Sequence, residues 1–381
     1  MPEKDNGKTG WMIRGTEEGR HYGIDLLRML AMAMIVMLHT LSRSGLLSQT
    51  ESLSLRYEAV WLIEIFCYCA VDCFVLISGY VGLHTKFRIS RILLLWAQVA
   101  FYNVGFEICF QLAAGEWDAL AILRSCFPLL TDAYWFFTQY MVLCFLMPFL
   151  NRGILALSVR QSVLLTGVLL FFLSFVPMLI QGPVPLIGGE SGADPFFTGR
   201  GYSILWFIVL YICGGTLKRL AEQGCLKNIK WYQPALLYLG GSTLTWLIKY
   251  ACESHGISAY FAVSYTGIFV VMAAISLFLL FAGLRFGKWV NKGIKIAAPA
   301  TFAVYLIHSN ANVYEVYTQA VAPLLDMRLL KLVPCLLLTV FVVFTGCVVI
   351  DLVRAVLFRV TRLDKACRLT DHWKMNQWFN E

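Results

Sequence analysis

The chain has 381 residues, of which 59% are hydrophobic and only 14% charged, and its mean hydropathy is +0.69. This composition excludes a soluble globular protein and indicates an integral membrane protein. The formal net charge of +8 is better explained by membrane topology than by a nucleic-acid partner, which we do not expect.

Apolar windows of about 20 residues, the length that a transmembrane helix needs, recur along the chain. We therefore predict an all-α, polytopic membrane protein with about ten transmembrane helices. The windows are 23–42, 60–83, 89–113, 134–150, 162–181, 202–217, 232–251, 262–284, 296–313 and 332–353. The polar residues 1–22 are followed by a long apolar run, so no cleavable signal peptide is expected.

The basic residues indicate the topology of these windows. Of the 31 Lys and Arg residues, 23 lie in the N-terminal segment, in the loops after even-numbered windows and in the C-terminal segment, and six lie in the other loops. Because Lys and Arg accumulate on the cytoplasmic side, both termini are predicted to be cytoplasmic. The predicted organisation is a cytoplasmic segment (1–22), a membrane domain (23–353) and a basic amphipathic tail (354–381) along an anionic membrane surface.

The first window, GIDLLRMLAMAMIVMLHT (23–40), contains Asp25, Arg28 and His39. Ionisable groups in a bilayer cost at least about 2.5 to 3.5 kcal/mol, so they point to function. Arg28 and His39 differ by only ~20° in azimuth on a helix and by ~16 Å along its axis, with Arg28 near the cytoplasm. The alternatives are that Arg28 snorkels or pairs with Asp25 and that His39 forms only an interfacial hydrogen bond.

The second window runs inward and brings more polar groups to matching depths. Glu64 is predicted near the depth of His39, Asp72 near mid-membrane and Ser78 to Tyr80 near Arg28. A carboxylate beside His39 would orient the imidazole for general-base work. Glu64 could equally face water outside the membrane.

A basic cluster follows in HTKFRISR (84–91), where Lys86, Arg88 and Arg91 lie near the predicted depth of Arg28. Guanidinium groups bind phosphate by paired hydrogen bonds, so this cluster is a candidate phosphate site. The alternative is the ordinary basic signal of a cytoplasmic loop.

Three further features of the sequence allow more than one interpretation. In the ninth window, Tyr305 and His308 share a helix face, although a buried histidine often has only a structural role. Cys67, Cys69 and Cys73 lack zinc-site spacing, so no metal is expected, and a disulfide between the predicted outer residues Cys126 and Cys252 stays open. The Gly- and Pro-rich loop 181–201 could be a lid, an acceptor-binding loop or a loose exterior loop.

Taken together, these residues resemble acyltransferase family 3 of membrane O-acyltransferases. Arg28, which follows IDLL, and His39 have ten residues between them and resemble the family's arginine and histidine signature, and VDCFVLISGY (71–80) resembles its Asp-x-Phe-Phe-x-x-Ser-Gly-Phe/Tyr segment. RISR (88–91), YWFFTQY (134–140) and YLIH (305–308) are similar to its later blocks. The resemblance covers nearly the whole membrane domain.

The resemblance implies a bacterial cytoplasmic membrane enzyme that transfers an acyl group, usually acetyl, from cytoplasmic acyl-CoA to a hydroxyl at the outer face. The acceptor would be a surface polysaccharide or another envelope molecule, with acetyl-CoA as co-substrate and no metal. His39 would be the general base or, alternatively, carry a covalent acyl group. The other implied site residues are Glu64 and Asp72 beside His39, Arg28, Ser78, Tyr80, Arg88 and Arg91 for the donor, and Tyr134, Trp135 and His308 for the acceptor.

Two other classes of function compete with this interpretation. A proton-coupled transporter also uses buried His39, Arg28 and Asp72 as relay groups, but it predicts two related halves with broken helices, which the sequence lacks. A receptor or scaffold would leave the matched depths of the polar residues unexplained.

Overall fold

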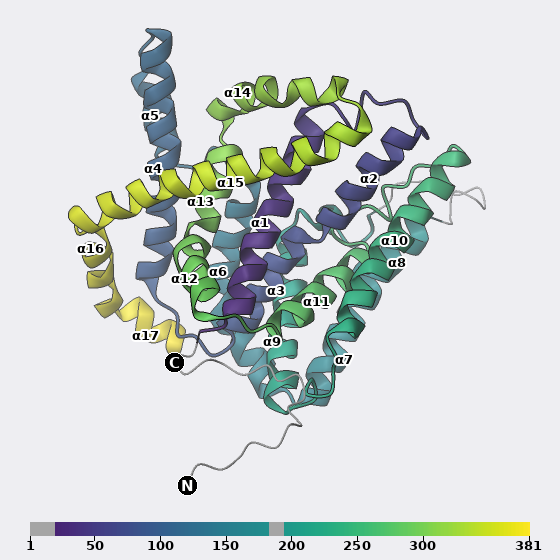
Figure 1. The fold of residues 1–381 in the computed structure, drawn as a ribbon. Helices are drawn as coiled ribbons and strands as arrows, with labels where there is room; N and C mark the ends of the chain where they lie inside the picture. The colour runs from purple at the N-terminus through teal and green to yellow at the C-terminus, as the bar shows by residue number, and fades with distance from the viewer. Residues whose placement is uncertain (1–19, 183–193) are drawn as a thin grey trace.

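The computed structural model describes residues 20–182 and 194–381, and within these ranges every regular element is a helix (Figure 1). This confirms the all-α fold class. The helices are α1 (Tyr22–Arg43), α2 (Leu55–Tyr68), α3 (Ala70–Gly82), α4 (Ile89–Ala114), α5 (Ala119–Ser125), α6 (Trp135–Ala156), α7 (Val159–Leu170), α8 (Val176–Gln181), α9 (Ile204–Glu222), α10 (Tyr232–Ser254), α11 (Ile268–Ala282), α12 (Lys288–Ala297), α13 (Thr301–His308), α14 (Ala311–Val321), α15 (Leu329–Val360), α16 (Leu363–Leu369) and α17 (Lys374–Asn380).

The predicted count of about ten spans is not confirmed. Among the described residues, seven helices are long and apolar enough to cross a membrane: α1, α2 with α3, α4, α6, α7 with α8, α9 and α15. The eighth window contains the shorter apolar helix α11. The ninth window is broken, because α13 ends at His308 and Asn310 starts α14 as its N-cap.

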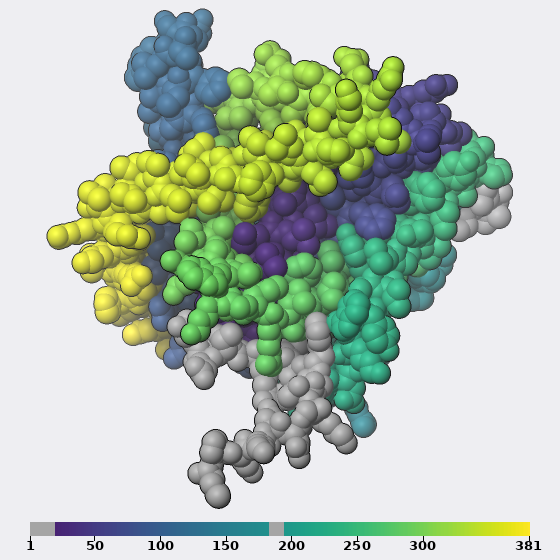
Figure 2. Space-filling model, in the orientation of Figure 1, coloured from purple at the N-terminus to yellow at the C-terminus, as the bar shows by residue number. Residues whose placement is uncertain are grey.

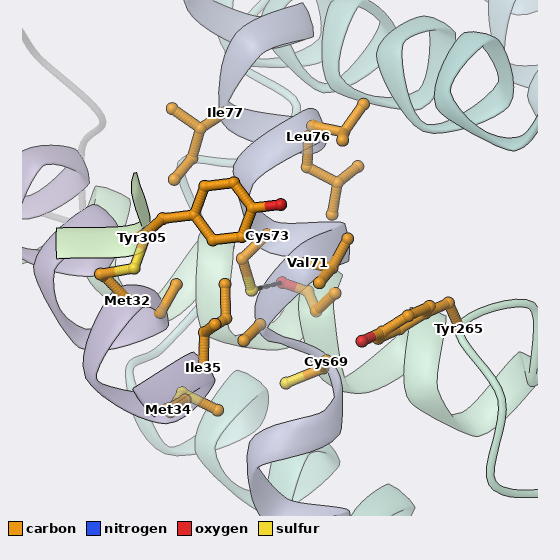
Figure 3. Close-up of a cluster of buried hydrophobic side chains, with 14 of the residues drawn as sticks. Met32, Met34, Ile35, Cys69, Val71, Cys73, Leu76, Ile77, Tyr265 and Tyr305 are labelled. Atoms are coloured by element: carbon orange, nitrogen blue, oxygen red, sulfur yellow. Dashed lines mark hydrogen bonds between the residues drawn. The ribbon is translucent and has the colours of Figure 1, made fainter. Parts of the chain in front are cut away.

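The first helix lies at the centre of the fold. α1 packs against α2, α3, α11, α13 and α15, and most of its side chains are buried. In Figure 2, α1 is visible only in a recess between α15 and the helices α10 to α12. Figure 3 shows Met32 and Ile35 of α1 next to Val71 and Cys73 of α3. The polar residues of the first window are therefore enclosed by protein.

Two glycines allow α3 and α9 to pack closely. A Cβ at Gly214 would lie 2.1 Å from the carbonyl oxygen of Leu76, and a Cβ at Gly79 would lie 2.1 Å from that of Tyr211. Small residues at such positions let helix backbones approach each other in membranes. This close contact sets the position of α3, which lines the cavities described below.

We expect Gly214→Ala to lower the free energy of unfolding by about 1 to 3 kcal/mol, because the added methyl group must push the two backbones apart. The matched control is Gly105→Ala in α4, where a Cβ would meet no atom within 4 Å. That change should be neutral or stabilising by up to about 1 kcal/mol. Thermal unfolding of both variants in detergent tests this, and equal stability would contradict the proposed contact.

The C-terminal segment folds back onto α4 and α6. α16 packs on α4, and α17 packs on α6. The Asn376 side chain accepts a hydrogen bond from the backbone of Ile89, and the Asn380 side chain accepts one from Phe87. These amides satisfy backbone donors at the start of α4, as N-cap residues do. The predicted contact of the tail with a membrane surface stays a prediction.

All twelve cysteines are free thiols, including Cys126 and Cys252. The disulfide that the sequence left open is therefore absent from the described structure.

Candidate functional site

The structure brings two histidines from distant parts of the sequence into contact. His39, near the end of α1, has its Nδ1 atom 2.9 Å from Nε2 of His308, the last residue of α13. The hydroxyl of Ser309 lies 3.3 Å from the same Nδ1 atom. His308 is buried, whereas His39 is partly exposed to a cavity.

The hydrogen bonds determine which nitrogen of each ring carries a proton. Nδ1 of His308 lies 2.5 Å from the carbonyl oxygen of Val304, and because a carbonyl only accepts, this Nδ1 must be the donor. In the neutral ring, Nε2 of His308 is then an acceptor, so Nδ1 of His39 donates to it. Nε2 of His39 is left unprotonated, and no described residue hydrogen-bonds it. His39 therefore presents a free base.

The break after α13 holds His308 in place. The Arg43 guanidinium donates to the backbone carbonyl of His308 at 2.9 Å and lies over the rings of Tyr314 and Tyr317. The side chain of Asn310 accepts from the backbone of Asn312 at the start of α14. A helix cap and a cation thus fix the turn that ends α13, and with it the position of the imidazole.

His39 lines a cavity of about 200 Å³ at the centre of the bundle, here called the central cavity. Met32 and Ile35 of α1, Val71 of α3 and Tyr305 of α13 line one part of it, and Figure 3 shows these side chains close together. Much of the remaining wall is aromatic and consists of Tyr68, Phe74, Trp135, Phe136, Tyr202, Tyr265 and Phe302. A largely apolar cavity with a few polar groups is typical of a small-molecule site.

The two candidate carboxylates take different positions. Glu64 is buried and lines the central cavity, and its Oε2 atom has no hydrogen-bond partner. Asp72 is fully buried behind the cavity, where its Oδ1 atom accepts from the indole of Trp206 at 3.2 Å. Neither carboxylate contacts His39. The orienting partner that the sequence assigned to a carboxylate is instead the imidazole of His308.

A second cavity, of about 80 Å³, lies at the far end of α3 and is here called the arginine cavity. Lys86, Arg88 and Arg91 line it together with residues of α6 such as Cys144 and Met147. None of these three cations forms an ion pair within the described chain, so all are available to an anion. Arg28 differs, because its guanidinium is paired with Asp25 at 2.7 Å and does not line this cavity.

Partly buried residues of α3 and α6 lie between the two cavities. On α6, Phe136 lines the central cavity and Met147 the arginine cavity, with Tyr140 between them. The Tyr140 hydroxyl lies 3.2 Å from that of Ser78 on α3. From Phe136 to Met147, which line the two cavities, α6 rises about 16 Å.

Of the remaining predicted site residues, one lines the central cavity and two are buried in the helix packing. Trp135 lines the central cavity. Tyr134 is buried, and its hydroxyl donates to the carbonyl of Leu306 and accepts from Asn310, so it supports α13. Tyr80 is buried against Phe278 and does not line either cavity.

Sequence reasoning missed several residues of this site. Arg43 lies one helical turn after His39, and Tyr68 one turn after Glu64, so helical spacing was an available signal for both. Tyr202 and Tyr265 follow no such spacing, because loops bring them to the cavity. The predicted lid covers 181–201, and its residues 183–193 lie outside the described structure.

A family model described as an acyltransferase domain, that of acyltransferase family 3, matches residues 21–352. The chain belongs to acyltransferase family 3. No curated protein and no solved structure matches the sequence.

This acyltransferase is a multi-pass membrane protein, given its apolar helices. The matched region begins just before α1 and ends within α15, so it contains both histidines and the arginine cavity. Membership of an acyltransferase family favours group transfer over the proton-coupled transporter that the sequence left open.

Proposed function

We propose that this protein is a transmembrane O-acyltransferase of the bacterial cytoplasmic membrane. It transfers an acetyl group from cytoplasmic acetyl-CoA to a hydroxyl of a cell-surface polysaccharide or another envelope acceptor. The observation that carries the proposal is the free Nε2 of His39, which His308 orients at the wall of the central cavity. A general base near neutral pH typically contributes about 10²- to 10⁴-fold to a rate.

The donor would enter from the arginine cavity. The phosphate groups of acetyl-CoA would bind Arg88 and Arg91, which are exposed and form no ion pair with a carboxylate of the described chain. The thioester end would pass between Ser78 and Tyr140 into the central cavity. The rise of about 16 Å between the cavities is compatible with an extended pantetheine arm.

In the transfer step, the acceptor oxygen attacks the thioester carbonyl carbon while Nε2 of His39 takes the hydroxyl proton. The C–S bond then breaks, the acyl ester forms, and the proton moves from His39 to the departing CoA sulfur. His308 accepts a hydrogen bond from His39 throughout and stabilises the imidazolium. Glu64, which lines the central cavity, is the candidate acceptor of a hydrogen bond from the incoming hydroxyl. Asp72 would act only indirectly, by holding α3 and α9 together through Trp206.

Vesicles with a defined orientation test this function. Inverted membrane vesicles, which expose the cytoplasmic face, are supplied with acetyl-CoA labelled in the acetyl group, and base-labile label is measured on the envelope fraction. We expect labelling in inverted vesicles and none in intact right-side-out vesicles, because acetyl-CoA does not cross the membrane. Vesicles from a strain lacking the gene are the control. Equal labelling from both faces, or none from either, would contradict the proposal.

The pairing of the histidines gives a separate prediction. His308→Leu removes the acceptor for His39 Nδ1, and losing one hydrogen bond of about 1.4 kcal/mol in the transition state should reduce transfer about tenfold. His308→Gln keeps a carbonyl acceptor and should lose less. Acetyl-CoA binding should be unchanged in both variants. Identical kcat values for the Leu and Gln variants would contradict the positioning role.

A further inference from the structure

The segment that carries the cations of the arginine cavity has no regular structure of its own. Residues 85–88 precede α4 and include Lys86 and Arg88, while Arg91 lies in the first turn of the helix. Arg88 is the N-cap residue of α4, but its side chain forms no capping hydrogen bond. Because the first backbone N–H groups of a helix have no partner within the helix, they need one from elsewhere. The position of the three cations therefore depends on what else binds this backbone.

Two asparagines of α17 supply the missing partners. Asn380 bonds both backbone groups of Phe87, because its Oδ1 atom accepts from the N–H at 2.9 Å and its Nδ2 atom donates to the carbonyl at 3.0 Å. The Oδ1 atom of Asn376 accepts from the N–H of Ile89 at 2.9 Å. Figure 1 shows α17 next to the start of α4. The backbone that carries the cations is thus bound by side chains 287 and 293 positions later in the sequence.

α17 is itself held against both walls of the arginine cavity. The ring of Phe379 stacks on that of Phe87, with ring centres 4.3 Å apart. The carbonyl of Phe379 accepts a hydrogen bond from Arg152 of α6 at 2.8 Å, and α6 forms the opposite wall of the cavity. Asn376 is 6% exposed, and its Nδ2 atom donates to the carbonyl of Thr370 at 3.0 Å. The contact is therefore a packed joint between α17, α6 and the segment before α4.

The chemistry of this joint suits a site for an anion with several phosphates. The cations of the arginine cavity form no ion pair within the described chain, so they repel one another and need a fixed backbone to stay together. Amide side chains fix that backbone without adding a charge that would compete with phosphate. The carboxylate of Asp371 accepts from the N–H of Ser90 at 3.4 Å and forms no ion pair with a described cation. Ordering the segment in advance reduces the entropy that a ligand must otherwise offset on binding.

We propose that α17 is a positioning element of the donor site, in which Asn376 and Asn380 hold the segment before α4 so that its cations meet the phosphates of acetyl-CoA together. This inference rests on the proposed function. It assigns a role to a part of the chain beyond the family match, which ends at residue 352. No residue of α17 lines the arginine cavity, so both asparagines act through the backbone that they bind.

The double variant Asn376→Ala, Asn380→Ala in the full-length protein tests this positioning role. A protein that has its binding-competent conformation only about a tenth of the time shows an apparent Kd about tenfold higher, and we expect a rise of that size for acetyl-CoA. The Kd is obtained from thermal unfolding in detergent over a series of acetyl-CoA concentrations. In inverted vesicles, the KM for acetyl-CoA should rise by the same factor, while kcat at saturating acetyl-CoA stays unchanged.

Gln377→Ala is the matched control, because Gln377 lies on the same helix, is exposed and forms no side-chain hydrogen bond within the described chain. It should keep the wild-type Kd and KM. Asn380→Ala alone is the milder variant, since this side chain is exposed. It should show the same pattern with a smaller rise in Kd, and it provides the test if the double variant does not fold.

Amide hydrogen exchange separates positioning from a general loss of stability. In the double variant, the N–H groups of Phe87 and Ile89 lose their acceptors, so a peptide covering residues 85–92 should exchange faster, while peptides from the buried centre of α1 keep the wild-type rate. Unchanged exchange at 85–92 overturns the proposal, and so does faster exchange with a wild-type Kd. Tighter binding of acetyl-CoA by the variant overturns it too, because α17 would then obstruct the donor site. Folded wild-type protein that neither binds nor consumes acetyl-CoA instead overturns the proposed function, and this inference with it.

Discussion

His39→Ala is expected to lower acyl transfer by at least about 10²-fold while leaving acetyl-CoA binding intact. The variant removes the free Nε2 base from the wall of the central cavity, whereas the arginine cavity lies elsewhere along α3. The measurement is kcat for labelled acetyl transfer in inverted vesicles. Thermal stabilisation by acetyl-CoA in detergent is measured on the same preparation.

His39→Gln serves as the matched control, because it retains a polar side chain of similar size without a base of suitable strength. It should be about as inactive as the alanine variant. If either variant keeps transfer within a few-fold of the wild type, His39 is not the base. If both variants also lose stabilisation by acetyl-CoA, His39 contributes to donor binding, and the assignment of separate sites is wrong.

The double variant Arg88→Ala, Arg91→Ala is expected to lose at least about 10²-fold in affinity for acetyl-CoA, since hydrogen bonds to charged groups contribute about 1.5 to 3 kcal/mol each. A ligand at 100 times its Kd stabilises a folded protein by about 2.7 kcal/mol, so the wild type should unfold at a higher temperature when acetyl-CoA is added. The double variant should show little or no shift at the same concentration.

Arg160→Ala is the control for the double variant. Arg160 is exposed at the start of α7, in another predicted cytoplasmic loop, and does not line the arginine cavity. Its removal should leave the acetyl-CoA shift unchanged. A full shift in the double variant would move the donor site elsewhere. A folded wild type that shows no shift would contradict acetyl-CoA as the donor.

Local periodicity made part of this site predictable. Arg28 and His39 were expected on one face of a helix, and the structure has both in α1 with Met32 and Ile35 between them along the cavity wall. Glu64 was expected near the depth of His39, and both line the central cavity. Such relations depend on the rise and rotation of a helix, which hydrophobic pattern and spacing reveal.

The number of spans was less predictable, because hydropathy does not detect where a helix breaks inside an apolar run. The ninth window ends its helix at His308, since Asn310 caps the next one. That break positions the imidazole, so the feature that the span prediction missed is also the one on which the site depends.

By itself, the sequence of this protein determined the all-α membrane fold, the helix that carries Arg28 and His39, and the basic cluster after α3. Only the tertiary structure decided that His308 contacts His39 across 269 positions of sequence. It also decided that Asp72 accepts a hydrogen bond from Trp206 and does not contact His39, and that Asn376 and Asn380 support the start of α4. The physical reason is the range of the interactions. Helical spacing follows from neighbouring residues, whereas contacts between helices depend on how closely their backbones pack, as at Gly79 and Gly214.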